Sequence, residues 1–353
     1  MRAQCGEGAS HARLTWRPGA IDLHNEDVEL LSGLDELDRR AAELDRQALA
    51  APFIDRFCSS SSWILPAAEA LMPPGQPLVA AGDLGFLAAV VRKRGELRAL
   101  EPFEASWGLA SPLVGGSPER LADAAAEILV SREADWDLLV LSGLPLGSPL
   151  LDRLARRLSR RYRVGLGPVT RRHIASLAGG MDGFLSRRPR RLRKGLRQAL
   201  RRATDEGIRF EPLRAESAGE ADALFERILD VERRSWKGRT GVGLVEEPMR
   251  EFYRRVSRRL AAAGQYRLLM GRQEDEDVAY VLGAIFGDTY RGLQFSFDER
   301  CVHLGLGNLA QYHQLAELAR EPTIRSYDLG TGGEYKSDWA EDGWDSVCLV
   351  AAR

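Results

Sequence analysis

The sequence predicts a mixed α/β protein of two domains, each built from a mixed, mostly antiparallel sheet flanked by helices. Three observations support this prediction. The chain has 353 residues, more than one domain usually holds. A hydrophobic share of 44% can fill two cores, and a net charge of -1 describes a balanced surface and excludes a polyelectrolyte. Segments with helical and strand periodicity are interspersed through both halves.

The first half is expected to begin with a flexible tail over residues 1–20, whose polar composition follows neither period. A helix is expected over residues 25–49, where Leu and Ala recur at three- and four-residue spacing. Further strands are expected at 77–81, 86–92, 98–100 and 136–141, and further helices at 117–130 and 149–161. We therefore expect residues 21–170 to form the first domain.

Residues 171–353 are expected to form the second domain, in which the order of elements is clearer. Strands are expected at 208–213, 266–272, 278–286, 290–297, 324–329 and 346–352, and helices at 217–235, 248–263 and 307–320. Acidic and Gly-Asp turns join the three strands from 266 to 297, so these strands should be antiparallel neighbours.

Cysteine usage and hydropathy indicate a soluble cytoplasmic protein. Cys5, Cys58, Cys301 and Cys348 are widely scattered, which supports neither a disulfide framework nor a zinc site. The first 18 residues lack an apolar core of secretory length, and no later stretch has the length and apolar character of a membrane span. Neither a metal nor a redox cofactor is implied.

A glycine-rich segment, FDERCVHLGLGN, starts at Phe297, ends one predicted strand and opens the helix at 307. Glycines at a helix start let backbone N–H groups approach a phosphate, and the helix dipole favours negative charge. The segment is therefore a candidate pyrophosphate cradle, although a simple glycine-rich helix entry explains it equally well. The candidate donor-binding residues are Phe295, Ser296, Val302, Gly305, Leu306, Gly307 and Asn308.

A second polar segment, YDLGTGGEYKSDW, starts at Tyr327 and follows the end of the predicted strand. In it, Lys336 could hold a phosphate or a carboxylate, or stabilise the oxyanion of a tetrahedral intermediate. Its alternative role is an ion-pair partner of Asp328 or Asp338. A Tyr-Lys pair just after loop glycines is poorly explained by packing, so we favour the functional role.

These motifs resemble those of the BioF-like or CelD-like acetyltransferase family of the GNAT superfamily. A strand ending in Asp-Leu-Gly-x-Gly, then Tyr-Lys and a Trp three residues later, is also similar to the C-terminal motif of Fem-type peptidyltransferases, which are tandem GNAT proteins. Pro52-Phe53 with Trp63, the basic segment 189–202 and the Glu232 to Gly238 helix end have counterparts in this family. Val302 departs from it, since GNAT proteins usually carry Gln or Arg there.

The resemblance implies two tandem GNAT-like domains, of which the first is degenerate and the second is an N-acyltransferase. The donor implied is acyl-CoA or acetyl-CoA, or an acidic acyl carrier protein, and the acceptor is a small-molecule or peptide amine. Amine acylation needs a base and a proton for the thiolate. The catalytic candidates are Asp328, His303, Tyr335 and Lys336, and the expected substrate contacts are Trp236, Tyr253 and Trp339.

Two alternative functions stay open at this point. The arginine-rich helix at 189–202 could hold a phosphorylated donor, an acidic carrier protein or a tRNA backbone, although such a run is usually a solvated helix face. An aminoacyl-tRNA-dependent, Fem-like peptidyltransferase is therefore one alternative. A noncatalytic GNAT-like binding protein is the other, because Val302 weakens the case for a coenzyme A site.

Overall fold

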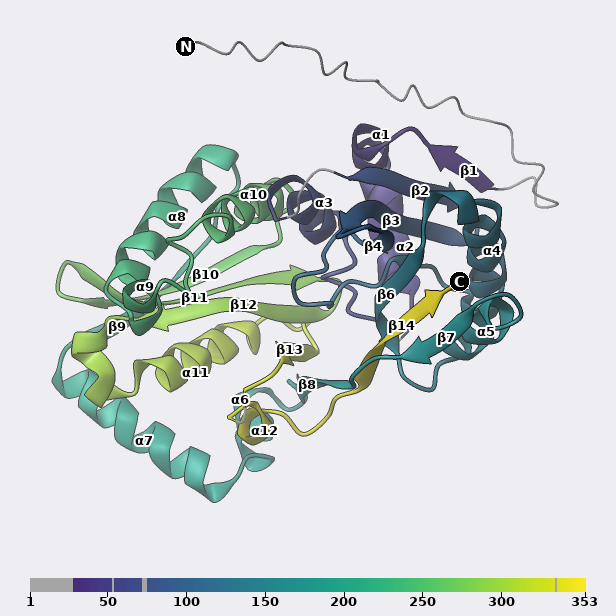
Figure 1. Cartoon of the computed structure of the whole chain (residues 1–353). Coiled ribbons are helices and arrows are strands. Elements are labelled where there is room, and N and C mark those ends of the chain that lie inside the picture. The colour runs from purple at the N-terminus through teal and green to yellow at the C-terminus, as the bar shows by residue number, and fades with distance from the viewer. Residues whose placement is uncertain (1–27, 53, 72–74, 334) are drawn as a thin grey trace, which may run out of the picture.

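The computed structural model describes residues 28–52, 54–71, 75–333 and 335–353 (Figure 1). The expected tail at 1–20 lies outside the described residues, as do Phe53 and Glu334. Within the described part, helices flank one large mixed sheet whose strands run in the order β1-β2-β3-β4-β6-β14-β8-β13-β12-β11-β10-β9, with β5 beside β3 and β7 beside β14. The mixed α/β fold class predicted from the sequence is confirmed.

Most expected elements of the first half are present with shifted ends. Its strands are β1 (Val28–Leu31), β2 (Gln76–Gly82), β3 (Gly85–Arg94), β4 (Leu97–Pro102), β5 (Leu113–Val114), β6 (Leu138–Pro145), β7 (Arg163–Leu166) and β8 (Thr170–Ser176). Its helices are α1 (Leu34–Arg39), α2 (Ala41–Ala50), α3 (Ser61–Ala70), α4 (Pro118–Ser131) and α5 (Pro149–Leu158). A short 3₁₀ helix, η1, covers Glu133–Asp135.

The second half contains the expected three-strand antiparallel unit, since β11 pairs with both β10 and β12. Its strands are β9 (Ile208–Leu213), β10 (Tyr266–Gln273), β11 (Glu276–Phe286), β12 (Thr289–Phe297), β13 (Ser326–Thr331) and β14 (Asp345–Ala352). Its helices are α6 (Gly180–Ser186), α7 (Arg190–Asp205), α8 (Ala218–Arg233), α9 (Trp236–Thr240), α10 (Met249–Ala262), η2 (Glu299–Leu304), α11 (Leu306–Leu318) and α12 (Lys336–Trp339). Helices α8 and α10 cover one face of β9 to β12, and α7 and α11 lie on the other (Figure 1).

The prediction of a single helix over residues 25–49 is wrong. Residues Val28–Leu31 instead form β1, which pairs antiparallel with β2, and the helical part is divided into α1 and α2 at Arg40. Gly33, in extended backbone, separates the strand from α1. Leu30 and Leu31 fit both a helical and a strand periodicity, so the sequence pattern does not distinguish the two. Pairing with β2 selects the strand, because tertiary contacts commonly override local propensity.

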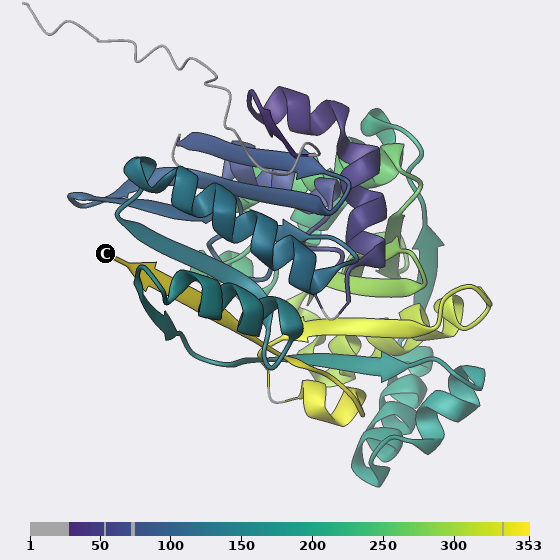
Figure 2. The same ribbon diagram turned by 90° about the vertical axis from the view of Figure 1, so that its right-hand side faces the viewer.

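The last strand, β14, does not pair with β13. A sheet formed by the second half alone would require that pairing. Strand β14 lies between β6 and β7 of the first half, and its first residues also pair with β8. In exchange, β8 pairs with β13 of the second half. Figure 2 shows β14, in yellow, running beside strands of the first half. The two halves are therefore interlocked through their sheets.

The main apolar core also crosses between the halves. Trp63 on α3 lies with its ring centroid 4.9 Å from that of Phe252 and 6.1 Å from that of Tyr253, both on α10. Phe57 lies 6.5 Å from Phe286 on β11 in the same way. These contacts explain the Trp63 motif as packing between halves. Within the part of the chain that the structure describes, no helix combines the length and apolar character needed to cross a bilayer.

Truncation of the Leu349 side chain tests whether β14 contributes to the core of the first half. Leu349 is fully buried in the core of the first half, so Leu349→Ala should lower the free energy of unfolding by about 2–5 kcal/mol. Val350→Ala, on the same strand but at a partly exposed position, is the control and should cost less. Urea unfolding followed by circular dichroism measures both. Equal midpoints for the two variants would contradict the assignment of β14 to this core.

Candidate active site

The strands β12 and β13 diverge and leave a gap. They pair in parallel only where residues 289–291 meet residues 326–328, and the remainder of each strand is not paired with the other. Strand β12 also carries a bulge on its other side, because Leu282 pairs with Gln294 and Gly283 with Gly292, which leaves Leu293 unpaired. A bulge of this kind breaks the ladder and redirects the strand. The gap and the bulge together open the sheet at this point.

A cavity of about 110 Å³ lies at this gap, and we call it the gap cavity. Its lining residues are Lys237, Val281, Gly292, Leu293, Gln294, Phe295, Gln311, Tyr327, Leu329, Tyr335 and Lys336. Three residues selected from the sequence, Phe295, Tyr335 and Lys336, therefore lie around one space. The Tyr335 ring meets the Phe295 ring edge to face, with centroids 6.3 Å apart.

The Lys336 ammonium is held at the gap cavity by its own loop. Its Nζ donates a hydrogen bond of 2.6 Å to the carbonyl oxygen of Thr331 at the end of β13. Burial, and then the positive charge of Arg291, lower the pKa of Lys336 to about 8. A substantial fraction of this amine is therefore neutral at physiological pH, unlike that of an ordinary surface lysine.

A second lysine, Lys237, enters the gap cavity from α9. Its Nζ donates to the carbonyl oxygen of Phe295 at 2.8 Å and to Gln294 Oε1 at 3.2 Å. Gln294 Nε2 in turn donates to Tyr253 Oη at 2.9 Å. Burial lowers the pKa of Lys237. Sequence reasoning noted the segment around Lys237 without selecting it, and only the fold brings it to the cavity.

The N-terminus of α11 has the properties expected of the phosphate cradle. Gly305 precedes the helix in the left-handed conformation, at φ 71°, and no side chain caps the helix start. The first backbone N–H groups of a helix lack partners within the helix. Gly307 packs against the gap cavity, since a Cβ placed on it would lie 3.3 Å from the Phe295 ring.

The basic helix α7 lies beside this helix start. A Cβ placed on Gly305 would be 3.8 Å from the guanidinium of Arg202. Leu192 and Leu196 are buried, so the charged face points outward. Six exposed basic residues on α7 make no ion pair with any carboxylate of the described residues: Arg190, Arg193, Lys194, Arg197, Arg201 and Arg202. This face, which we call the α7 basic face, is available to an anion.

Asp328 belongs to a buried network of charges that joins the halves. Its Oδ2 accepts from Arg172 Nη2 at 2.7 Å, and its Oδ1 accepts from Arg291 Nη1 at 2.7 Å and from the Gly330 N–H at 2.7 Å. Arg172 Nη1 lies 2.6 Å from Asp55 Oδ2, close enough for an ion pair although not aligned as a hydrogen bond. Burial raises the pKa of Asp328, but Arg172 and Arg291 outweigh it and lower the pKa to about 2.

The network changes how Asp328 is interpreted. Both carboxylate oxygens are occupied by buried arginines, and a group with a pKa of about 2 is a weak proton acceptor at neutral pH. We therefore do not carry Asp328 forward as the general base. The alternative considered for Lys336, an ion pair with Asp328 or Asp338, is absent from the described residues, where Asp338 instead pairs with Arg191.

The remaining sequence candidates are distributed around the site. Val302 and His303 are exposed on η2 and do not line the gap cavity, while Ser296 and Leu306 are buried. Asn308 is exposed in the first turn of α11. Trp236 is half exposed on α9, next to Lys237.

Trp339 does not lie where a substrate could reach it. It is 1% exposed and packs against Phe184, with the ring centroids 6.0 Å apart. This burial leaves no ring face for a ligand, so we do not retain Trp339 as a substrate contact. Tyr253 is also buried and reaches the cavity only through Gln294.

The comparisons with known proteins agree with this geometry. The family model of the acetyltransferase (GNAT) domain matches residues 190–339, which include the gap cavity and the start of α11. This segment is similar to the GNAT domain, and the GNAT relationship predicted from the sequence is confirmed. No match to a curated protein was found.

Solved structures show the same fold over nearly the whole chain. FemX is similar with a TM-score of 0.60 and 12% identity, over 90% of this chain and 96% of its own. A conserved protein of unknown function from Bacteroides thetaiotaomicron gives a TM-score of 0.58 at 12% identity, over 92% and 100%. The C-terminal domain of a protein named as a lysylphosphatidylglycerol synthetase from Agrobacterium fabrum gives 0.54 at 12%, over 88% and 92%. The likeness spans both halves and concerns the fold.

Removing the Asp328 charge should destabilise the protein strongly. Asp328→Asn leaves two arginines short of a buried counter-charge, so the free energy of unfolding should fall by about 3–5 kcal/mol. Asp338→Asn, which removes the partner of the exposed Arg191, should cost about 0–1 kcal/mol. Urea unfolding at pH 7 measures both variants.

The stabilisation by Asp328 should also depend on pH. Its pKa in the folded protein lies below the ordinary value of 3.8, so its contribution is complete above about pH 4 and is lost as the pH falls towards 2. The difference between wild type and Asp328→Asn should shrink over that interval. A difference that is small at pH 7, or that does not change on acidification, would contradict the buried network.

Proposed function

We propose that the C-terminal half transfers an acyl group from acyl-CoA to an amine acceptor by direct attack on the thioester. The observation that carries this proposal is the gap cavity between β12 and β13. It holds Lys336, whose pKa is about 8, and one of its walls, Phe295, packs against the uncapped start of α11. A reactive amine and a phosphate-binding helix end thus lie on two sides of one opening in the sheet.

In this proposal the donor is held by its phosphates. The backbone N–H groups at Leu306, Gly307 and Asn308 bind the diphosphate, since they lack partners within the helix and lie at the positive end of its dipole. The α7 basic face adds positive charge beside them. The thioester end of the donor then reaches into the gap, where the bulge leaves Leu293 outside the strand ladder. In this proposal the N–H of Leu293 polarises the thioester carbonyl.

Lys336 is the proposed general base. Its neutral form takes a proton from the ammonium of the acceptor, and the free amine attacks the thioester carbonyl. The carbon–sulfur bond breaks, and the thiolate takes a proton from the Tyr335 hydroxyl, which burial keeps protonated by raising its pKa. The attacking nitrogen gives its second proton to the Tyr335 oxygen, and Lys336 releases its own proton to solvent, so that both groups are restored. Lys237 fixes the Phe295 carbonyl and the Gln294 side chain around this space.

We assign the working site to residues 171–353 and a supporting role to residues 21–170. The first half contributes Asp55 to the charge network and Trp63 to the packing of α10. Both contacts hold the elements around the gap cavity. The amine acceptor is expected to enter the gap cavity on the side of Lys336, with Trp236 exposed nearby on α9.

The pH dependence of the reaction tests the role of Lys336. A base must be neutral, so kcat/KM should rise with pH and level off above about pH 8. Lys336→Met and Lys336→Arg should both lower kcat/KM by about 10²–10⁴-fold, because neither supplies a neutral amine. Thiol release from acyl-CoA in the presence of an amine measures the rate.

The Lys336→Arg variant distinguishes two roles of Lys336, a general base and a fixed positive charge. If Lys336 acts through its charge, Lys336→Arg retains activity and the wild-type rate falls above pH 8, and either result would remove the base assignment. Arg160→Gln, at an exposed position of the first half and away from the gap cavity, serves as the control for general effects of mutation and should leave the pH profile in place.

A charge at the start of α11 tests the phosphate cradle. Asn308→Asp places a negative charge in the first turn, where it stabilises the helix through the dipole but repels a bound phosphate. The KM for acyl-CoA should rise about tenfold, equivalent to about 1.4 kcal/mol, with thermal stability unchanged or higher. Asn308→Gln is the neutral control. An unchanged KM for Asn308→Asp would show that the donor phosphates bind elsewhere.

The α7 basic face also favours a second candidate, a Fem-like transfer from aminoacyl-tRNA. The six basic residues of the α7 basic face form a larger positive surface than a diphosphate needs, and an extended phosphate backbone would contact them in a salt-sensitive manner. Transfer from aminoacyl-tRNA with inert acyl-CoA would select this function. Thiol release from acyl-CoA that requires an amine selects the acyl-CoA reaction.

A further inference from the structure

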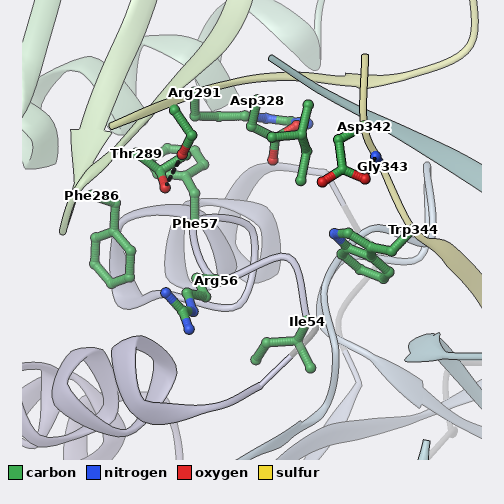
Figure 3. A pocket seen from close by; sticks show the side chains of 12 residues that line it. Ile54, Arg56, Phe57, Phe286, Thr289, Arg291, Asp328, Asp342, Gly343 and Trp344 are labelled. Carbon is green, nitrogen blue, oxygen red and sulfur yellow. Dashed lines mark hydrogen bonds and ion pairs between the residues drawn. The ribbon is translucent and has the colours of Figure 1, made fainter. Parts of the chain in front are cut away.

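A second cavity, larger than the gap cavity, lies between the two halves (Figure 3). Its volume is about 340 Å³, within the range of small-molecule sites. We call it the interdomain cavity. The segment after α2 forms one wall, and β8, the β11–β12 turn, β13 and the segment before β14 form the others. None of the described residues lines both cavities, so the proposed acyl transfer does not use this one.

Of the described residues, four charged side chains line the interdomain cavity, and two of them form no ion pair. Arg291 and Asp328 pair with each other, with 2.7 Å between Nη1 and Oδ1. Arg56 donates only from Nε, to the Ala51 carbonyl oxygen at 3.1 Å, so its two terminal nitrogens are unused. The Asp342 carboxylate accepts only the N–H of the next residue, at 2.7 Å. Arg56 and Asp342 are therefore available to a ligand.

The two unpaired charges stand well apart in the cavity (Figure 3). Arg56 lies between α2 and α3 in the first half, whereas Asp342 precedes β14 and is bonded through its backbone to Ile174 on β8. A ligand whose two charged groups are bonded to one carbon, such as an α-amino acid, cannot reach both. A ligand that binds both must therefore carry its anion and its cation at opposite ends.

The walls between these charges are apolar. Ile54, Phe57 and Phe286 are buried and line the cavity, and the Trp344 ring lies beside Asp342 (Figure 3). Methylene groups gain free energy when they leave water for such a surface. An arginine offers a forked pair of donors to a carboxylate, and a carboxylate accepts from an ammonium group. The matching ligand has a carboxylate at one end, an ammonium at the other and an apolar chain between them.

The polar groups on the inner wall are already bonded to one another. Thr289 Oγ1 and Ser326 Oγ lie 2.9 Å apart and share a hydrogen bond, and Arg291 pairs with Asp328. A saturated chain leaves these bonds in place and asks for no new partner. We therefore favour a saturated chain over one that is interrupted by polar groups.

We propose that the interdomain cavity binds an ω-amino acid, a molecule with a saturated chain between a carboxylate and an ammonium group. Arg56 binds the carboxylate, Asp342 binds the ammonium, and the chain lies against Ile54, Phe57 and Trp344. This site is separate from the gap cavity and does not depend on the acyl transfer, so the failure of one proposal leaves the other standing.

Calorimetric titration of the full chain with γ-aminobutyrate, ε-aminocaproate and ω-aminooctanoate tests this site with three chain lengths. Norleucine is the matched control, because it is an isomer of ε-aminocaproate that carries both charges on one carbon. The ω-amino acid whose chain fits the separation of the two charges should bind at least tenfold more tightly than norleucine. Absence of binding by all three, or equal or tighter binding of norleucine, would overturn the proposal.

Removing one ligand charge at a time tests the two ends separately. The analogues are the alkylamine and the fatty acid with the same number of carbons, which for ε-aminocaproate are hexylamine and hexanoate. Each should bind at least tenfold more weakly than the ω-amino acid. Equal or tighter binding of the fatty acid would assign the cavity to an amphipathic anion, and that of the alkylamine to an amphipathic cation. Either result would contradict a ligand with two charged ends.

Two variants locate the binding. Arg56→Gln should abolish the preference for the ω-amino acid over the alkylamine, and Asp342→Asn should abolish its preference over the fatty acid. Both positions are exposed, so the fold should tolerate the changes. Arg160→Gln and Asp83→Asn, which change exposed charges outside the cavity, are the controls and should leave the affinities unchanged. Binding that neither cavity variant changes would show that the ligand lies elsewhere and would overturn the proposal.

Discussion

The buried charge network is the interaction on which the arrangement of both halves depends. Asp55 precedes α3, Arg172 lies on β8, Arg291 on β12 and Asp328 on β13, so four distant segments must meet for these charges to be compensated. A buried charge without its partner costs several kcal/mol. The network therefore penalises any arrangement in which the two halves separate, and it fixes β8 against β13 at the centre of the sheet.

The same network sets the chemistry of the gap cavity. Asp328 is neutralised by two arginines, and the positive charge of Arg291 acts together with burial to lower the pKa of Lys336. A carboxylate that could have served as a base is thus committed to structure, while a lysine is made more readily neutral. The assignment of roles follows from the environment of each group rather than from its intrinsic acidity.

The likeness to FemX and to the other solved structures extends over both halves at 12% identity, which shows a shared fold and leaves the reaction open. Function in such a fold depends on which side chains meet at the opening between β12 and β13. Here two lysines and two tyrosines lie around that opening, and a basic helix lies beside the start of α11. In the proposed function, this arrangement holds an anionic donor and moves the protons of the acyl transfer.

The sequence by itself determined the elements of the second half and the local motifs. The periodicity of β10 to β12 and α11 is strong, and the glycines before α11 and the Tyr-Lys pair have local signatures that do not depend on distant contacts. It therefore placed Phe295, Tyr335 and Lys336 among the candidates. It could not place Lys237 beside them, because that proximity arises from the packing of α9 against β12.

Only the tertiary structure decided which candidates share a space and which are buried. Asp and Trp are residue types that are common in functional sites. Asp328, however, is enclosed by arginines from distant segments, and Trp339 is buried in the core. The strand at 28–31 and the exchange of β8 with β14 likewise depend on partners far along the chain. Local periodicity carries no information about such partners, since pairing is decided by what each strand can bury and bond when the whole chain is assembled.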